Sequence, residues 1–402
     1  MKTWVKTTLT IGLCLIPAGL IVGFSNSWSN KTPISAVGSS SVKPFLENLS
    51  DLYMKGDGKN DDITVEAGGS GFGIEQIADG LTNIGNASKD PYETVMTPEK
   101  QGDTEGKFRQ KWIDNKIKTI TIAWEGICNV FIPPKGLDYN GDINELLSVN
   151  DENITNYFRI FSGINDGFDW TDKTIAVNSM YHFVNPSITI DQHDQYLLKN
   201  TLITPFVRGG GSQVSGTADS FIKDTHIHGF IPFDDGDKKS KLSLDQQIAF
   251  KTGKYGTSFG LSETGEPNSM AWDKFQNNNK NGSIVYLSSG FVSQPDNSSI
   301  IKKRGYGIIA YEGKVFETKS IDEGYNWYRP LTCMISVKNQ NSPEIKFLKN
   351  IFKKNYLDIL ALGAQPIYKP EDIFFMFPHG FDADWKSDND LGHLNMGGSF
   401  VP

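Results

Sequence analysis

Three strand–loop–helix units with the same loop chemistry constrain the fold of this chain more than any other feature. In residues 36–49, AVGSSSVKPFLENL, a strand ends at a glycine and three serines, and an apolar-periodic helix follows. Residues 67–77, AGGSGFGIEQI, repeat this order, and residues 215–221, SGTADSF, place a cap before a third helix. Because strands and helical segments also alternate along the rest of the chain, the sequence predicts an α/β fold.

Each unit presents hydroxyls and free backbone N–H groups at a helix N-terminus. Such a terminus carries about half a positive charge and favours an anion by roughly 0.3–1 kcal/mol when it is exposed. Residues 207–221, VRGGGSQVSGTADSF, add Arg208, whose guanidinium can hold a phosphate or carboxylate through two parallel hydrogen bonds. Serine and threonine cap most helices, so one unit alone indicates little. The three units and the Arg-Gly-Gly-Gly run together predict a site for a small oxyanion.

The composition limits the partners of such a site. The chain has 402 residues, enough for two domains, and a formal charge of -8. Nucleic-acid binding needs a basic face, so no nucleic-acid partner is expected for this acidic chain. No third ligand is evident for the His226-x-His228 pair, and the sequence has no Cys-x-x-Cys pattern, so no metal or other cofactor is predicted.

The first 30 residues are typical of an export signal or an N-terminal membrane anchor. After Lys2 and Lys6 there is no charged residue before Lys31, and the stretch from Lys6 to Lys31 is largely apolar. A segment of that length can also span a bilayer. The sequence therefore predicts an extracytoplasmic, exported protein, either membrane-associated through this segment or released, and leaves cleavage open.

The sequence does not decide the role of two polar segments and of two cysteines. Segments 133–200 and 222–282 are polar and low in periodicity, and we interpret them as long surface insertions on one domain. Cys128 and Cys333 both lie in apolar, strand-like runs. Two buried thiols are the simplest interpretation, although an exported protein could also pair them in a disulfide.

An ordered set of short motifs resembles the phosphate-binding subunit of ABC phosphate transporters, a periplasmic or extracytoplasmic substrate-binding protein. In chain order the matching stretches are GSSSVKPF, GGSGFGI, IGNASKDP, AWEGICNVFI, RGGGSQVSGTADSF, IVYLSSGF, YNWYRPLTCMI and FLKNIF…LGAQPI. They cover nearly all of residues 33–367, and it is their order, not any single motif, that is specific. The resemblance implies a two-lobed periplasmic-binding-protein fold of type II, with a mixed sheet in each lobe and a ligand cleft between the lobes.

The resemblance also implies how the chain is divided. The expected segments are a leader (1–30), the first part of lobe I (31–126), lobe II with its polar insertions (127–333), and the second part of lobe I with the tail (334–402). The chain would cross between the lobes near residues 126–130 and 330–334.

The function implied by the resemblance is to bind inorganic phosphate by closure of the two lobes and to deliver it to an ABC transporter permease. The protein would act as a monomer and without catalysis. The residues carried over as phosphate ligands are Ser40, Ser41, Ser70, Lys89, Arg208, Ser215, Gly216 and Thr217.

This chain departs from the family pattern at two places. Three more residues than usual separate Arg208 from Ser215. In addition, Lys89 stands where some members of the family have an aspartate. A carboxylate at that place would accept the proton of hydrogen phosphate and reject sulfate, which has no proton at neutral pH. Glu125 is a possible carboxylate acceptor in its stead, and Asp90 is another.

Two other functions remain open. The same fold could bind sulfate or another oxyanion, or act as a sensor or surface protein, which long polar insertions would suit. The second alternative is a serine acyl-transfer enzyme, because residues 40–43, 251–253 and 387–389 match the Ser-x-x-Lys, Lys-Thr-Gly and Ser-Asp-Asn motifs of penicillin-recognising enzymes. Their order along the chain differs from that of those enzymes, so no enzymatic activity is expected.

Overall fold

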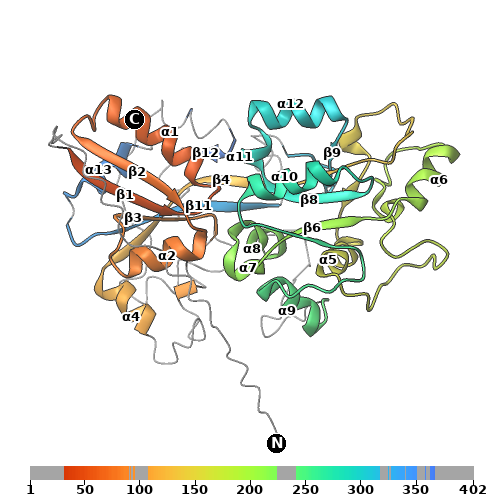
Figure 1. Ribbon diagram of the computed structural model, residues 1–402, viewed down its shortest axis with the longest axis horizontal. Helices are drawn as coiled ribbons and strands as arrows, with labels where there is room; N and C mark the ends of the chain where they lie inside the picture. Colours follow the sequence, from red (N-terminus) through yellow and green to blue (C-terminus); the bar gives the residue numbers. More distant parts are fainter. Residues whose placement is uncertain are drawn as a thin grey trace, which may run out of the picture.

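The computed structural model of the protein describes residues 31–89, 91, 94–95, 107–223, 241–316, 325, 327–339, 341–350, 358 and 363–366. Within these ranges the chain forms two lobes that lie side by side. Figure 1 shows lobe I mainly in red and orange and lobe II mainly in green and cyan.

Lobe I is built on parallel strands that run into helices. β1 (Thr32–Gly38) pairs in parallel with β2 (Asp61–Ala67) and with β3 (Ile84–Ala87). α1 (Lys43–Lys55) follows β1, with a proline in its first turn, and α2 (Ser70–Ala78) follows β2. Because the three strands are parallel, the Gly/Ser loops at their carboxyl ends meet at one edge of the sheet.

Two strands connect the lobes. β4 (Ile117–Phe131) is antiparallel to β11 (Tyr328–Ser336) up to Gly126, and from Ile127 onward it pairs with β8 (Ser283–Ser288) of lobe II. At the junction the Ile127 N–H donates to the Trp327 carbonyl at 2.9 Å. Among the described residues the strands therefore form one hydrogen-bonded path in the order β2-β1-β3-β11-β4-β8-β6-β7.

The sheet of lobe II is covered by helices on both faces. β6 (Thr204–Arg208) pairs in parallel with β8 and with β7 (Ser262–Thr264), and β9 (Gly307–Ile308) pairs with the end of β4. In Figure 1 the helices α10 and α12 lie above this sheet and α5, α7, α8 and α9 lie below it. The helices of lobe II are α5 (Ile154–Ser162), α6 (Gln192–Asn200), α7 (Gly211–Val214), α8 (Gly216–Lys223), α9 (Leu244–Thr252), α10 (Asn268–Asn278), α11 (Ser289–Val292) and α12 (Pro295–Arg304).

Smaller elements complete the described chain. β5 (Ser148–Val149) and β10 (Ala310–Tyr311) form a separate two-stranded sheet. The others are α4 (Lys107–Asp114), η2 (Ile143–Glu145), η3 (Met180–Phe183), α13 (Pro343–Asn350) and β12 (Gln365–Pro366).

The core of lobe II is rich in aromatic rings. Phe221 of α8 stacks on Tyr286 with ring centroids 4.1 Å apart, and on Trp327 at 5.3 Å. Every residue of α5 is buried, including Tyr157 and Phe161. Stacked and edge-to-face rings of this kind add to the stabilisation that comes from burial.

The described parts of the two polar segments combine exposed stretches with elements of the core, so they are not surface insertions throughout. Segment 133–200 contains the buried helix α5, and segment 222–282 contributes Phe250, Trp272 and Phe275 to the core of lobe II. The buried Arg159 of α5 donates from Nη1 to Asn156 Oδ1 and to Asp169 Oδ1, each at 3.0 Å. These segments therefore hold core elements between polar loops.

Cys128 and Cys333 are free and buried. Cys333 lies opposite Ile120, eight residues before Cys128 on the same strand β4. An extended strand separates such positions by roughly 26 Å, so the thiols cannot form a disulfide. The interpretation as two buried thiols is confirmed.

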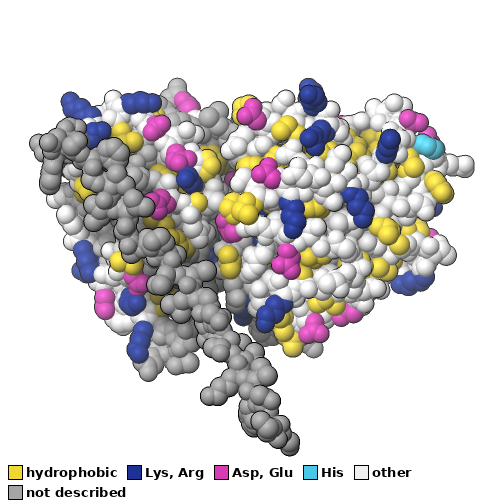
Figure 2. Space-filling view, in the orientation of Figure 1, with side chains coloured by type: hydrophobic (Ala, Val, Ile, Leu, Met, Phe, Trp, Pro, Cys, Tyr) yellow, Lys and Arg dark blue, Asp and Glu magenta, His cyan; other side chains and the backbone are white. Residues whose placement is uncertain are grey.

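In the part of the chain that the structure describes, no helix combines the length and the apolar character needed to cross a bilayer. The leader (residues 1–30), Asp90, His226, His228 and residues 387–389 lie outside the described residues. Figure 2 shows basic and acidic side chains interspersed over the visible face of both lobes.

Candidate functional site

The loops after β1, β2 and β3 bring three buried serines together. The Ser39 hydroxyl donates to Ser88 Oγ at 2.9 Å, and Ser70 Oγ lies 3.3 Å from Ser88 Oγ. Ser70 is the first residue of α2, and Ser88 directly follows β3. We call Ser39, Ser70 and Ser88 the serine cluster; it places hydroxyls at the N-terminus of α2.

Lobe II contacts the serine cluster with the N-terminus of α8. A Cβ atom on Gly216, the first residue of α8, would overlap with Ser70 Oγ and Ser88 Oγ, so any larger residue here would force these side chains to shift. The Ser220 hydroxyl donates to the Ser88 carbonyl at 3.3 Å. Two helix N-termini from different lobes therefore meet here, and both favour negative charge.

The other two residues predicted at this helix start are also buried. Ser215 is the residue before α8, and its hydroxyl accepts a hydrogen bond from the Ala218 N–H at 3.3 Å. Thr217 follows Gly216 in the first turn and is 2% exposed. The structure thus brings Ser70, Gly216 and their neighbours together, as the sequence predicts, and gives Ser215 the role of a helix cap.

A second set of polar groups links the lobes next to the serine cluster. Ser41 Oγ accepts hydrogen bonds from Arg329 Nη2 at 2.8 Å and from Asn268 Nδ2 at 3.2 Å. Asn268 Oδ1 in turn accepts from Arg208 Nη2 at 2.7 Å. We call Ser41, Glu125, Arg208, Asn268 and Arg329 the arginine network. Since the Ser41 hydroxyl accepts from two donors, its own proton is free for a further acceptor.

Arg208 is held inside lobe II by its own surroundings. It is 1% exposed and donates from Nη1 to the Pro267 carbonyl at 2.9 Å and from Nη2 to the Tyr286 carbonyl at 3.1 Å. Burial lowers the pKa of Arg208 to about 10. The three residues inserted after the arginine contribute to the short helix α7, and the side chain reaches the junction between the lobes through Asn268.

The Glu125 carboxylate is not free to accept from a ligand, because Arg329 and a backbone N–H already bond to its two oxygens. Glu125 Oε2 accepts from Arg329 Nη2 at 2.8 Å and from Nε at 3.1 Å, and Oε1 accepts from the Gly290 N–H at 3.2 Å. Both side chains are 0% exposed. Burial raises the pKa of Glu125, and the Arg329 guanidinium opposes this change. Glu125 is therefore a residue that positions Arg329.

Each guanidinium of the arginine network retains a donor for which the described residues offer no acceptor. These donors are Arg208 Nε and Arg329 Nη1; outside the network, Arg159 Nε is in the same state. Leaving a buried charged donor unpaired costs more than the 1–3 kcal/mol typical of a neutral one. A bound anion would supply such acceptors.

Sequence reasoning missed three residues of this site. Arg329 lies within the motif YNWYRPLTCMI, and the register of β4 and β11 places it directly opposite Glu125. Glu266 lies in the loop before α10 and Asn268 is the first residue of that helix; both fall in segment 222–282, which the sequence indicates as a polar insertion. The Ser40 hydroxyl donates to the two Glu266 carboxylate oxygens at 3.2 and 3.4 Å.

Lys89 lies at the edge of the serine cluster. It is 5% exposed and follows Ser88 at the end of β3, and its carbonyl accepts from Thr332 Oγ1 at 3.4 Å. Asp90, the other carboxylate that the sequence suggested, is outside the described residues.

A groove of about 480 Å³ opens between the lobes beside the arginine network. Ser40, Ser41, Asn268 and Ser288 border it, so the arginine network reaches an accessible cavity through Ser41 and Asn268. Its other walls are formed by Pro44, Phe45, Asn48, Pro267, Ser269, Gly290, Phe291, Ser293, Gln294, Pro295 and Gly363. This volume lies in the range of small-molecule sites.

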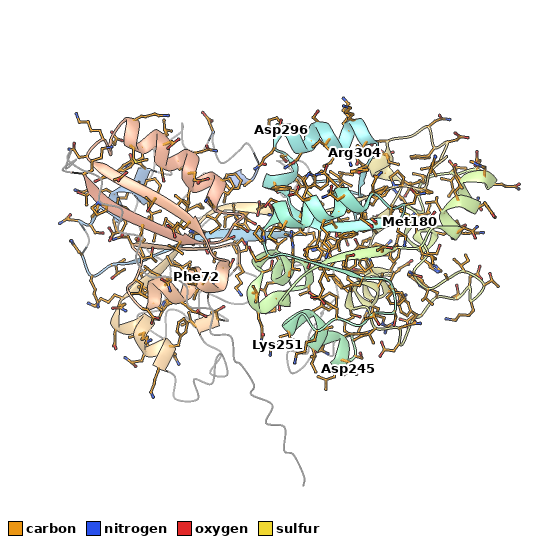
Figure 3. All side chains as sticks on the ribbon, in the orientation of Figure 1. Phe72, Met180, Asp245, Lys251, Asp296 and Arg304 are labelled. Atoms are coloured by element: carbon orange, nitrogen blue, oxygen red, sulfur yellow. The ribbon has the colours of Figure 1, made fainter. Side chains whose placement is uncertain are left out.

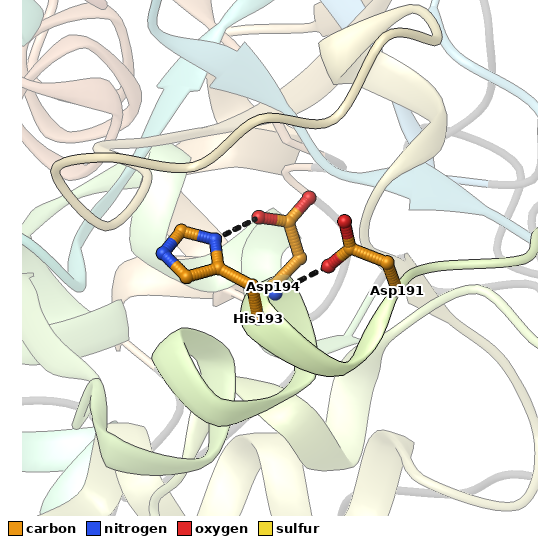
Figure 4. A group of neighbouring side chains, drawn as sticks. All are labelled: Asp191, His193 and Asp194. Atoms are coloured by element: carbon orange, nitrogen blue, oxygen red, sulfur yellow. Dashed lines mark hydrogen bonds and ion pairs between the residues drawn. The ribbon is translucent and has the colours of Figure 1, made fainter.

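One group of possible metal ligands lies among the described residues, at the start of α6 (Figure 4). Asp191 caps the helix by accepting from the Asp194 N–H at 2.8 Å, and Asp194 accepts from the Asp138 N–H at 2.9 Å. His193 Nδ1 lies 3.4 Å from Asp194 Oδ1. Capping and loop anchoring account for both carboxylates without a ligand.

The comparison with solved structures bears on the fold. A putative phosphate ABC transporter substrate-binding protein from Clostridium perfringens matches 84% of this chain and 100% of its own, with a TM-score of 0.50 and 16% identity. An ABC-type phosphate transport receptor from Vibrio cholerae has a TM-score of 0.47 and 15% identity. The likeness to the Clostridium perfringens structure confirms the predicted two-lobed periplasmic-binding-protein fold.

The comparison with curated sequences bears on the family. No family model matches the chain. The uncharacterized lipoprotein MG412 of Mycoplasma genitalium is 32% identical over 356 residues, which cover 84% of this chain and 82% of that protein. This chain therefore belongs to the same protein family as the lipoprotein MG412.

Proposed function

We propose that the protein binds inorganic phosphate between its lobes and presents it to the permease of an ABC transporter. The observation that carries this proposal is the meeting of two helix N-termini, from α2 and α8, beside two buried arginines that each keep an unpaired N–H among the described residues. A tetrahedral oxyanion supplies several acceptors at once, and backbone N–H groups, hydroxyls and guanidinium groups are its usual donors.

The arrangement suits binding by closure. Ser41 and Ser70 belong to lobe I, whereas Asn268 and Gly216 belong to lobe II, so a ligand held by both sets favours the closed state. The strands β4 and β11 connect the lobes at Gly126 and Tyr328 and provide a place for the hinge.

Two similar proteins support the transport role and the location. The Clostridium perfringens structure is that of a putative phosphate ABC transporter substrate-binding protein with bound phosphate, and MG412 is a lipoprotein. Together with the apolar segment in residues 1–30, these support an extracytoplasmic protein held at the membrane surface. That it acts without catalysis and as a monomer is part of the proposal.

The enzymatic alternative and the sensor or surface role gain no support from the described residues. Figure 3 places Lys251 on α9 of lobe II, whereas Ser40 precedes α1 of lobe I and contacts Glu266. This separation argues against an acyl-transfer site built from Ser40 and Lys251. The polar segments that suggested a sensor or surface role contribute helices to the core of lobe II.

Calorimetric titration of the full-length protein, stripped of ligand by partial unfolding and dialysis, tests the proposal. Phosphate should bind with a stoichiometry of one. Ser41→Ala should weaken binding about tenfold or more, because a hydroxyl that bonds a charged ligand is lost. Ser258→Ala, at an exposed serine of lobe II, is the control and should bind as the unmodified protein does. No heat with phosphate would overturn the assignment.

A further inference from the structure

The groove beside the arginine network is larger than inorganic phosphate requires. Its volume is about 480 Å³, whereas one water takes up about 30 Å³ in the liquid. An anion with four oxygen atoms would therefore fill only part of the groove. Both lobes line it, so a larger ligand within it would still be held by both. The walls of the groove indicate which chemical group suits the remaining volume.

Ser41 and Asn268 form a polar part of the groove that suits an anion. They are 4% and 5% exposed, and Ser41 Oγ accepts from both Arg329 Nη2 and Asn268 Nδ2, so the Ser41 proton is free to bond a ligand oxygen. Arg329 is 0% exposed, and its Nη1 has no acceptor among the described residues. Asn268 is also the first residue of α10, and the start of a helix favours negative charge. A phosphoryl group is therefore favoured next to Ser41.

Apolar side chains from both lobes form much of the rest of the groove. Pro44 and Phe45 belong to the first turn of α1, whereas Phe291 lies in α11 and Pro295 begins α12. Figure 1 shows these helices on one side of the connecting strands. A ligand group with an apolar face would lose contact with water against these rings, which favours binding.

Two glycines give the groove its shape next to Phe45. A Cβ on Gly290 would lie 2.8 Å from Phe45 Cζ, and a Cβ on Gly363 would lie 2.7 Å from Gly290 Cα. Side chains at these positions would displace the Phe45 ring or push the two segments apart. With glycine at both, the ring is packed in place at 7% exposure and forms a fixed apolar wall.

On the basis of the proposed function, we propose that the protein also binds phosphate monoesters and that the groove holds their organic substituent. A monoester keeps three terminal oxygens for the hydroxyl, N–H and guanidinium donors, and its fourth, bridging oxygen carries the substituent. A phosphoryl group bonded to Ser41 borders the groove, so the bridging oxygen directs the substituent into it. A small ring with an apolar face suits the walls that Phe45 and Phe291 provide.

Calorimetric titration of the full-length protein with inorganic phosphate, methyl phosphate and phenyl phosphate tests the proposal. All three should bind, and phenyl phosphate should bind about tenfold or more tightly than methyl phosphate, because its ring leaves water. Phe291→Ala removes a ring from the groove and should cancel most of this difference. Phe72→Ala, at a phenylalanine of α2 that is 44% exposed and lies outside the groove, is the matched control and should preserve it.

A second variant fills the groove from its exposed edge and leaves the core intact. Ser293 lines the groove and is exposed, so the indole of Ser293→Trp would take up the volume that the substituent needs. The affinity for phenyl phosphate should then fall about tenfold more than the affinity for inorganic phosphate. Ser258→Trp, at an exposed serine outside the groove, should leave the ratio of the two affinities unchanged.

The other outcomes separate this proposal from the proposed function. If inorganic phosphate binds and phenyl phosphate does not, the groove is only an entrance to the site, and the proposal is overturned while the proposed function stands. An equal loss of affinity for methyl and phenyl phosphate in Phe291→Ala would show that the ring supports the fold, which also overturns the proposal. If phosphate and both esters fail to bind, the proposed function itself fails.

Discussion

Glu125 and Arg329 form a charge pair that is sealed from solvent at the junction of β4 and β11. Glu125→Gln leaves the Arg329 charge buried and uncompensated, so we expect the free energy of unfolding to fall by about 3–5 kcal/mol. Urea denaturation measures the change. Glu47→Gln, which removes an exposed partner of Lys43, should cost less than about 1 kcal/mol. A loss of that smaller size for Glu125→Gln would show that the pair contributes little.

The two described cysteines should be inert in the folded protein. Burial raises the pKa of Cys333 to about 12, and it also raises the pKa of Cys128. The thiolate is the reactive form, so neither residue should react with a thiol reagent at neutral pH until the protein is denatured. Rapid labelling of either cysteine in the native protein, located by mass spectrometry, would contradict this.

Whether a site residue could be predicted from the sequence depends on how far along the chain its partners lie. Ser41, Ser70 and Gly216 could be predicted, because a strand, a glycine-rich loop and a helix start are local patterns. Arg329 and Glu266 could not, since their bonds to Ser41 and Ser40 join residues 288 and 226 positions apart. No local pattern records contacts that only the packing of two lobes creates.

At the scale of the element, the start of α8 decides how closely the lobes approach. Gly216→Ala would put a methyl group against Ser70 and Ser88, without harming a helix start. Overpacking of this kind costs about 1–3 kcal/mol, so phosphate affinity should fall roughly 5- to 150-fold while the lobes stay folded. Calorimetry and circular dichroism test the two parts.

A control glycine separates this effect from a general loss of stability. Gly56→Ala, after α1, meets no atom closer than 3.7 Å and should leave the affinity unchanged. Equal affinity of Gly216→Ala and the unmodified protein would show that the bound state does not bring α8 onto the serine cluster.

The sequence did not predict the core helix α5, because some of its buried residues are polar. The α/β alternation of lobe I followed from its strand–loop–helix units. The helix α5 is short and flanked by asparagine and aspartate, and its buried Asn156 and Arg159 hide its apolar periodicity. The buried Arg159 bonds to a partner, Asp169, which the local sequence does not identify.

For the whole molecule, ligand binding and stability are linked. A ligand that binds the folded protein alone stabilises it, by about 2.7 kcal/mol at a hundredfold excess over the dissociation constant. Phosphate at that concentration should raise the free energy of unfolding by this amount, as measured by denaturation. A smaller shift, with the calorimetric affinity in hand, would mean that the unfolded chain also binds phosphate.

The strand β4 belongs to both lobes: its fifteen residues pair with β11 on one side of Gly126 and with β8 on the other. Neither hydrophobic core can lose this strand without breaking the sheet of the other. Differential scanning calorimetry should therefore show one melting transition, with a calorimetric enthalpy equal to the van't Hoff enthalpy. Two resolved transitions would mean that β4 can fray from one lobe while the other remains folded.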